Sequence, residues 1–346
     1  VASTMNPVTF QTIGFKPRLE TSGGIALNGT VKYYQNGWSS SMNANNIVEL
    51  LPGSYKFKMY FHNGIQSQNS VTVSSSNTDV LFQTVSVTPQ LKDSDGTDLA
   101  GGTVKYYQNG WSSNMNANSI VELLPGSYNF KMYYHNGIQK ITKSVSGNSD
   151  NVLFQTVSVT PQLKDSDGTD LAGGTVKYYQ NGWSSNMNAN SIVELLPGSY
   201  NFKMYYHNGI QKITKSVSGN SDNVLFQTVS VTPALVDCND NPLSGGTVKY
   251  YQNGWSSNKT PNTAEELLPG SYKFKMYYNH GINYKTENVG TAASYTVRFQ
   301  ATQVNFAYGG NVKYYSNGWG PYSSGMYLLP QTYKFKFDNN YSKHIA

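Results

Sequence analysis

The side chains best placed for metal chemistry are three aspartates around one turn of a repeated sequence. Asp93, Asp95 and Asp98 enclose the stretch Asp-Ser-Asp-Gly. Carboxylate oxygens so close together could bind Ca²⁺, which takes oxygen ligands. The alternative is a solvated β-turn, where Asp and Gly are favoured. One further copy keeps the set, at Asp165, Asp167 and Asp170. The first and last copies instead read Thr21-Ser22-Gly23 and Ala307-Tyr308-Gly309. This variation favours the turn, and we predict no metal site.

The histidines offer no arrangement suited to catalysis. Four of the five occur singly, one at the same turn of each of four repeats, and no two have metal-ligand spacing. No Ser/His/Asp order, Cys/His pair or Gly-rich phosphate loop recurs either. We therefore predict surface turn residues, no cofactor and no enzyme activity. The histidines are His62, His135, His207, His280 and His344.

Aromatic residues are the best candidates for a ligand site. An Asn-Gly-Trp turn recurs, and at Trp111 it lies near Tyr106, Tyr107 and Tyr133. Exposed rings can stack on the apolar faces of sugars, which would make the chain a carbohydrate-binding array with surface glycans as partners. The alternative, favoured by the usual burial of Trp, is that Trp caps a β-sandwich or packs against the next repeat. The five residues are Trp38, Trp111, Trp183, Trp255 and Trp319.

Composition indicates extracellular β-structure. Only 13% of the 346 residues are charged, while Tyr is abundant at 28 and Asn, Ser, Thr and Gly are common. The formal charge of +6 comes from lysines at fixed repeat positions, so nucleic-acid binding is disfavoured. Cys238 is the single cysteine, which excludes an internal disulfide.

The remaining sequence features bear on location. No apolar run approaches the length of a membrane helix, and we predict no membrane insertion. The start Val1-Ala2-Ser3-Thr4 is typical of a mature end left after signal-peptide removal, which predicts a secreted, cell-surface protein. Glycan acceptor motifs occur at Asn28, Asn258 and Asn340.

The chain is built from repeats, which the tryptophans mark at spacings of 73, 72, 72 and 64 residues. Residues 80–161 are identical to residues 152–233. Such identity indicates that the repeats do the same task, as in a stalk or filament. The expected organisation is an N-terminal segment 1–12, repeat 1 (13–84), repeat 2 (85–156), repeat 3 (157–228), repeat 4 (229–300) and an incomplete repeat 5 (301–346).

Each repeat reads as a small β-sandwich. Repeat 2 predicts strands at 85–92, 103–108, 120–124, 127–134, 138–145 and 152–156, separated by turns such as Asn109-Gly110 and Pro125-Gly126. In 127–134, Tyr128, Phe130 and Met132 alternate with polar residues. About seven short strands and no helical period predict an all-β chain of Ig-like sandwiches. Since strand 152–156 runs directly into the next repeat, we expect a semi-rigid rod.

The turn and core motifs resemble a known family. Gly-x-x-Leu-Ala-Gly-Gly-Thr-Val at Gly96–Val104, followed by Leu-Leu-Pro-Gly-Ser-Tyr-x-Phe at Leu123–Phe130, is similar to the CnaB-type, prealbumin-like domains of bacterial surface proteins and pilins. The same pair recurs at Gly168–Val176 and Leu195–Phe202. The resemblance implies the sandwich fold and says little about function.

Many domains of that family carry a Lys–Asn or Lys–Asp isopeptide bond helped by a buried acid. The resemblance places the Lys at Leu91, Leu163 and Leu235, and the acid at Met132, Met204 and Met276. Because apolar residues stand at both positions, we predict that the isopeptide bond is absent from its usual place.

The two ends of the sequence carry complementary defects. Pro7–Thr12 reads PVTFQT, close to the last strand NVLFQT of repeat 2, and no repeat precedes it for it to complete. Repeat 5 keeps its first strands but lacks that last strand. We therefore expect a homopolymer that assembles head to tail by donor-strand complementation. The donor residues are Val8, Phe10 and Thr12, and the acceptor residues are Val312, Tyr314, Leu328, Tyr333, Phe335 and Ile345.

The expected role is the structural subunit of an extracellular, pilus-like filament. The alternatives are a rigid stalk segment of a cell-surface adhesin and a carbohydrate-binding repeat array.

Overall fold

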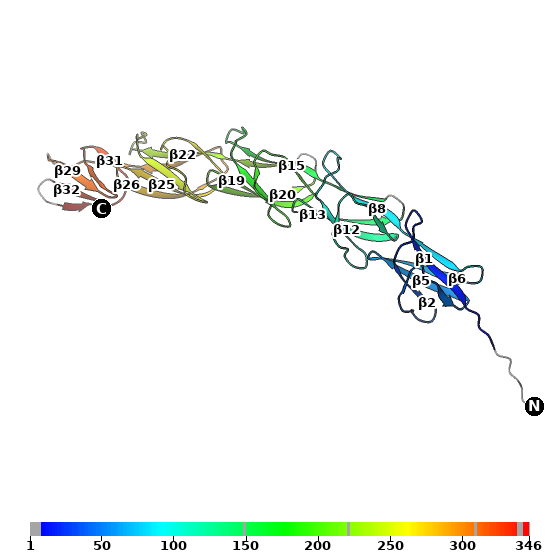
Figure 1. The fold of residues 1–346 in the computed structure, drawn as a ribbon. Helices are drawn as coiled ribbons and strands as arrows, with labels where there is room; N and C mark the ends of the chain where they lie inside the picture. The colour runs from blue at the N-terminus through cyan, green and yellow to red at the C-terminus, as the bar shows by residue number, and fades with distance from the viewer. Residues whose placement is uncertain (1–7, 148–149, 220–221, 308–309, 338–341, 346) are drawn as a thin grey trace, which may run out of the picture. The chain divides into compact units, whose positions relative to one another are not determined.

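The computed structural model describes residues 8–147, 150–219, 222–307 and 310–337, together with the backbone of 342–345. These residues form strands and turns, and no helix occurs among them (Figure 1). The protein is thus an all-β chain of small Ig-like sandwiches in tandem, as the sequence predicted. Residues 1–7, Asn340 and the side chain of Ile345 lie outside the description.

Repeat 2 shows the plan of a complete repeat. It contains seven strands. They are β8 (Val85–Lys92), β9 (Thr103–Tyr107), β10 (Met115–Asn116), β11 (Val121–Leu123), β12 (Gly126–Tyr134), β13 (Gly137–Val145) and β14 (Asp150–Gln155). The two-residue strand β10 was not predicted, and the other strand ends differ from the prediction by at most two residues.

The seven strands form two sheets. The order β10-β9-β12-β13 makes an antiparallel sheet, which we call the hairpin sheet because β12 and β13 are joined by a tight turn. The order β11-β8-β14 makes the closing sheet, in which β14 runs parallel to β8 and Val152 lies opposite Pro89. We call β14 and its equivalents the closing strands, since each supplies the last edge of its sandwich.

The core lies between the two sheets and follows the period of two. Tyr128, Phe130 and Met132 of β12 are fully buried, as the alternation predicted, and Phe154 of the closing strand is buried with them. The turn of the hairpin sheet uses His135 and Asn136, both at positive φ, before Gly137. Two consecutive residues with positive φ give the type I′ turn that matches strand twist.

The chain divides into two compact units, and the boundary passes through repeat 3. The first unit extends through Ser158 and also includes Glu194–Gly198. It contains repeat 1 and repeat 2. The strands of repeat 1 are β1 (Ile13–Glu20), β2 (Thr30–Tyr34), β3 (Met42–Asn43), β4 (Val48–Leu50), β5 (Gly53–Phe61), β6 (Gly64–Val73) and β7 (Asp79–Gln83), in the sheets β3-β2-β5-β6 and β4-β1-β7.

The second unit contains most of repeat 3 with repeats 4 and 5. The strands of repeat 3 are β15 (Val157–Lys164), β16 (Thr175–Tyr179), β17 (Met187–Asn188), β18 (Val193–Leu195), β19 (Gly198–Tyr206), β20 (Gly209–Val217) and β21 (Asp222–Gln227). Repeat 4 has β22 (Val229–Val236), β23 (Thr247–Tyr251), β24 (Glu265–Leu267), β25 (Gly270–Tyr278), β26 (Gly281–Val289) and β27 (Ser294–Gln300). The sheets of repeat 3 follow the plan of repeat 2, whereas the hairpin sheet of repeat 4, β23-β25-β26, has three strands and no equivalent of β10 among the described residues.

Repeat 5 has a complete hairpin sheet and a reduced closing sheet. The order β30-β29-β32-β33 forms the hairpin sheet, and β28 pairs antiparallel with β31 alone among the described residues. Its strands are β28 (Thr302–Val304), β29 (Val312–Tyr315), β30 (Trp319–Pro321), β31 (Met326–Leu328), β32 (Tyr333–Phe337) and β33 (Ser342–Ile345).

Candidate interaction sites

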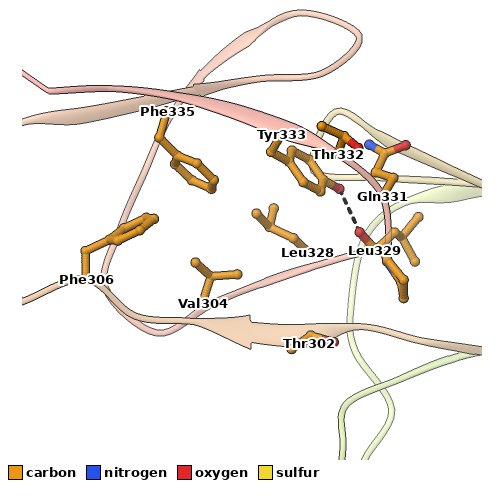
Figure 2. A pocket seen from close by; sticks show the side chains of 10 residues that line it. Thr302, Val304, Phe306, Leu328, Leu329, Gln331, Thr332, Tyr333 and Phe335 are labelled. Carbon is orange, nitrogen blue, oxygen red and sulfur yellow. Dashed lines mark hydrogen bonds between the residues drawn. The ribbon is translucent and has the colours of Figure 1, made fainter. Parts of the chain in front are cut away.

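An apolar groove of about 510 Å³ opens beside the unpaired edge of β28 in repeat 5. Figure 2 shows Val304, Leu328 and Phe335 pointing into it from three different strands. Tyr333 and Phe306 line the groove as well. Among the described residues, β28 pairs with β31 on one edge only, and the groove lies beside its other edge.

One polar contact anchors the wall of this groove. The Tyr333 hydroxyl donates a hydrogen bond to the Leu329 carbonyl oxygen at 3.1 Å (Figure 2). Burial raises the pKa of Tyr333 to about 12, so the hydroxyl stays protonated and keeps donating at physiological pH.

In the complete repeats, a closing strand occupies the place of this groove. Val152 and Phe154 of β14 are 2% and 0% exposed, and they belong to the core of repeat 2. The corresponding residues of the other closing strands are equally buried, and the strands pair in parallel with the first strand of the repeat. They are Val80 and Phe82, Val224 and Phe226, and Val297 and Phe299.

The predicted donor residues repeat the sequence pattern of a closing strand, but their side chains are exposed. Val8 is 78% exposed and Phe10 is 80% exposed. Thr12 is also exposed, and residues 8–12 form no strand.

The structure assembles most of the predicted acceptor residues in one core. Leu328, Tyr333 and Phe335 line the groove, while Val312 and Tyr314 are buried in the same cluster. Ile345 lies on β33, opposite Tyr333 in the strand register. Four further lining residues were not predicted from the sequence: Thr302, Val304, Phe306 and Leu329. Phe306 stands where complete repeats have Pro, and its ring packs 4.7 Å from that of Phe335, so it fills part of the space.

A second candidate site is the joint between neighbouring repeats, where one leucine of a repeat packs into the core of the repeat before it. Leu123 is buried in the core of its own repeat 2, whereas the adjacent Leu124 is buried in the core of repeat 1. Leu196 enters the core of repeat 2 and Leu329 that of repeat 4 in the same way. Leu51 is the equivalent residue of repeat 1, and 44% of it is exposed. Leu51 is therefore more exposed than its buried equivalents Leu124, Leu196 and Leu329.

A glutamate next to the exchanged leucine links the two repeats by hydrogen bonds. The Glu122 carboxylate accepts from Ser86 Oγ at 2.5 Å, from Thr84 Oγ1, and from the backbone N–H of Ser22 in repeat 1 at 3.4 Å. Burial raises the pKa of Glu122, but the hydrogen bonds from Ser86, Thr84 and Ser22 outweigh it, so the pKa lies below its usual value. Glu194 repeats this role with Ser94 and Thr156, and Glu266 repeats it with Ser166 and Thr228.

The hairpin turn of each repeat contacts the next repeat as well. His62 Nδ1 lies 3.2 Å from the Glu122 carbonyl oxygen, and the Asn63 side chain donates to the Trp111 carbonyl at 3.0 Å. Gly64 is required here, because a β-carbon would overlap the Tyr128 hydroxyl of repeat 2. Four of the predicted histidines, His62, His135, His207 and His280, are thus exposed turn residues, whereas His344 lies on strand β33.

The tryptophans are half exposed, which contradicts the favoured expectation of burial. Their exposed fractions run from 43% to 53%. Trp111 packs against Tyr107 of its own repeat, with ring centroids 5.3 Å apart, and every repeat has the same pair. The NGW turn therefore presents an aromatic pair to solvent, as a ligand site would require.

The aspartate-rich turns use their carboxylates locally. Asp93 Oδ1 accepts hydrogen bonds from the backbone N–H groups of Asp95 and Thr97, and Asp98 pairs with Lys92 at 2.8 Å. Within the described ranges, no three His, Cys, Asp or Glu side chains are grouped as metal ligands.

The other glycan acceptor sites, Asn28 and Asn258, are exposed.

The positions that the resemblance assigned to an isopeptide bond are core positions. Leu91, Leu163 and Leu235 are fully buried, and so are Met132, Met204 and Met276. In repeat 2, Leu91 and Met132 pack in the cluster that holds Tyr128 and Phe130.

Comparison with known proteins gives only distant likenesses. No protein-family model matches the chain, and no curated protein matches it. Among solved structures, the Bacillus anthracis TIE protein is 13% identical, with a TM-score of 0.23, over 87% of this chain and 76% of that one. A streptococcal ancillary pilin is 12% identical, with a TM-score of 0.20, over 63% and 99%. The pilus adhesin SpaC from Lactobacillus rhamnosus GG, in its open conformation, is 12% identical, with a TM-score of 0.21, over 78% and 50%. Likenesses this distant leave the function to the geometry of the sites.

In the part of the chain that the structure describes, no helix is long and apolar enough to cross a membrane.

Proposed function

We propose that the chain is a non-enzymatic structural subunit of an extracellular filament, in which each copy donates residues 8–12 to repeat 5 of the next copy. The observation behind this proposal is the match between a groove and a strand. The groove lies where complete repeats hold a closing strand, and Val8-Thr9-Phe10 repeats the Val-x-Phe pattern of those strands.

The register of the complete repeats fixes how the donor would lie. Val152 is opposite Pro89 in repeat 2, so Val8 would be opposite Phe306 in repeat 5. In this register the donor would lie parallel to the segment that follows β28 (Thr302–Val304), starting opposite Phe306, with Val8 and Phe10 directed into the apolar groove. The ring of Phe306 must move aside or pack over Val8 for the donor to enter.

The joint between repeats adds a second contact to the same interface. Val85 follows Thr84 without a linker, and Ile13 follows Thr12 in the same way. A donor strand seated in repeat 5 would therefore bring Leu51 to the end of that repeat, as Leu124 is brought to repeat 1. The exposed surface of Leu51 then becomes buried, as its equivalents are.

Such a contact uses different surfaces on the two copies. It therefore generates an open chain of subunits and does not close into a symmetric dimer. Backbone pairing and apolar burial provide the affinity, so the assembly needs no disulfide or covalent bond. Secretion and removal of a signal peptide belong to this proposal, because the filament is extracellular.

The test replaces Phe10 by Asp in the full chain, and the control replaces Ile25 by Asp. Ile25 is 70% exposed, similar to Phe10, so both changes add one charge to an exposed apolar side chain. We expect filaments from wild type and Ile25→Asp in negative-stain images and sedimentation, and monomers from Phe10→Asp. Filaments of normal length from Phe10→Asp would contradict strand donation.

A synthetic peptide with the sequence PVTFQT gives an independent measurement. Added to the Phe10→Asp monomer, it should raise the melting temperature of the least stable transition by filling the groove, and a peptide with Asp at the Phe position should not. Monomers from the wild-type chain at all concentrations would instead favour the stalk of a larger adhesin.

A carbohydrate-binding array remains the second candidate, because one observation favours it. The Trp–Tyr pairs are half exposed in every repeat, and such rings can stack on sugars. A glycan array with the monomeric variant tests this role separately from assembly.

A further inference from the structure

The outer face of each hairpin sheet carries lysines in an arrangement that costs stability. In repeat 2, Lys131 of β12 lies directly opposite Lys105 of β9 on one side and Lys140 of β13 on the other. Like charges directly opposite each other on neighbouring strands are destabilising. Three in a row therefore need a reason other than the stability of the fold.

Every repeat has such a pair on its central strands. The opposed residues are Lys32 and Lys58, Lys105 and Lys131, Lys177 and Lys203, Lys249 and Lys275, and Lys313 and Lys336. We call these pairs the lysine rows. They point away from the core, because their neighbours along the strand, such as Phe130 and Met132, are the buried ones.

No acidic residue neutralises the rows. The strands of the hairpin sheets contain a single acidic residue, Glu287. Within the described residues, the salt bridges of the lysines involve Lys92, Lys164, Lys215 and Lys259, and none of the row lysines. The rows are therefore uncompensated positive charge on a flat, partly aromatic surface.

The aromatic rings beside the rows are covered by the ammonium groups. Lys131 Nζ lies 4.8 Å from the centre of the Tyr133 ring, and Lys58 Nζ lies 5.2 Å from that of Trp38. A nucleic-acid base needs an open ring face on which to stack, and lysine occupies one face of the Tyr133 ring and one face of the Trp38 ring. Carboxylate groups need only the ammonium groups, which the rings hold in place.

We infer that the lysine rows bind an acidic polysaccharide, whose carboxylates pair with the opposed ammonium groups. Each row is a weak site, and a long polymer that reaches more than one row gains affinity from their linkage in one chain. The binding does not depend on filament assembly, since every row is complete within its own repeat.

The test measures binding of the full-length Phe10→Asp variant to alginate, a linear polymer of uronic acids, in 50 and 200 mM salt. Neutral dextran and a thymidine oligonucleotide serve as comparison ligands. The row variant carries Lys105→Gln, Lys131→Gln, Lys177→Gln and Lys203→Gln. The control carries Lys16→Gln, Lys92→Gln, Lys164→Gln and Lys259→Gln, which change the net charge equally at positions outside the rows.

We expect alginate to bind in a salt-dependent manner and dextran not to bind. The row variant should lose at least about tenfold in affinity, since each lysine near an anionic surface contributes measurably, and the control should change by less than about twofold. Equal losses in both variants, no alginate binding at 50 mM salt, or tighter binding of the oligonucleotide than of alginate would each overturn the inference. A melting curve shows whether the row variant is folded. If it is not, the single changes Lys131→Gln and Lys131→Arg are compared, and only the first should weaken binding.

Discussion

Leu51 and Leu124 occupy the same position in successive repeats, and replacing each by Ala should give different results. Leu124 is fully buried in the core of repeat 1, so its truncation leaves a cavity in a folded monomer. Such a change costs about 2–5 kcal/mol. Because each repeat is small, every kcal/mol lost from the free energy of unfolding should lower the melting temperature by about 4–8 °C.

Leu51 contributes to the monomer and also to assembly. A fully buried Leu contributes about 1.5–3 kcal/mol, and 44% of Leu51 is still exposed in the single chain. Burying the remainder in a joint between copies adds about 1 kcal/mol, which is about fivefold in the affinity of the joint. Leu51→Ala should therefore cost the monomer about 1 kcal/mol, less than Leu124→Ala, and raise the concentration needed for filaments about fivefold.

Calorimetry of both variants in the Phe10→Asp background gives the monomer stabilities. Sedimentation of both in the wild-type background gives the assembly threshold. Should Leu51→Ala destabilise the monomer as strongly as Leu124→Ala, the two leucines would not differ as their burial indicates. An unchanged assembly threshold for Leu51→Ala would refute its part in the joint between copies.

Three further predictions concern the charges and the covalent state of the repeats. Because hydrogen bonds hold the pKa of Glu122 below its usual value, its contribution to stability is present above the unfolded-state pKa and is lost as pH falls through the folded-state pKa; acid titration followed by calorimetry should show this loss below about pH 4.5, weakened in Glu122→Gln. Replacing Lys131 by Thr removes a like-charge opposition and should stabilise the protein by about 0.2–1 kcal/mol in denaturant titrations, whereas a loss of more than about 1 kcal/mol would show that the lysine stem is needed for packing. The intact mass should equal that of the linear sequence, since Leu91 and Met132 stand where an isopeptide bond would form; a mass lower by one ammonia per repeat would show the bond elsewhere.

The sequence predicted those elements that depend on local rules. Alternation in β12 identified Tyr128, Phe130 and Met132 as core residues, and all three are buried. The Asn-Gly and Pro-Gly pairs marked turns correctly, because Gly permits backbone angles that other residues avoid. Local rules also located the first strand of each repeat.

The joints could not be predicted in this way. Leu123 and Leu124 are identical in type and adjacent, yet one fills its own repeat and the other fills the repeat before it. That division depends on where the neighbouring core ends, which is a long-range property. The recurring Val-Glu-Leu-Leu-Pro sequence was the available signal, since a Glu kept among apolar residues indicates a specific partner.

The exchange of leucines explains how a small sandwich can be stable here. A domain of about 70 residues buries limited apolar surface by itself, and repeat 1 gains Leu124 from repeat 2 as part of its core. Each sandwich is thus completed partly by the repeat that follows it. Repeat 5 has an apolar groove and Leu51 of repeat 1 is 44% exposed, whereas the equivalent residues Leu124, Leu196 and Leu329 are buried. If assembly uses the same contact, the affinity between copies should follow the stability of the internal joints. We then expect one order of effect for the two kinds of joint. Variants of Glu122 and Leu124, ranked by lost stability in calorimetry, should follow the same order as variants of Leu51, ranked by the assembly threshold in sedimentation.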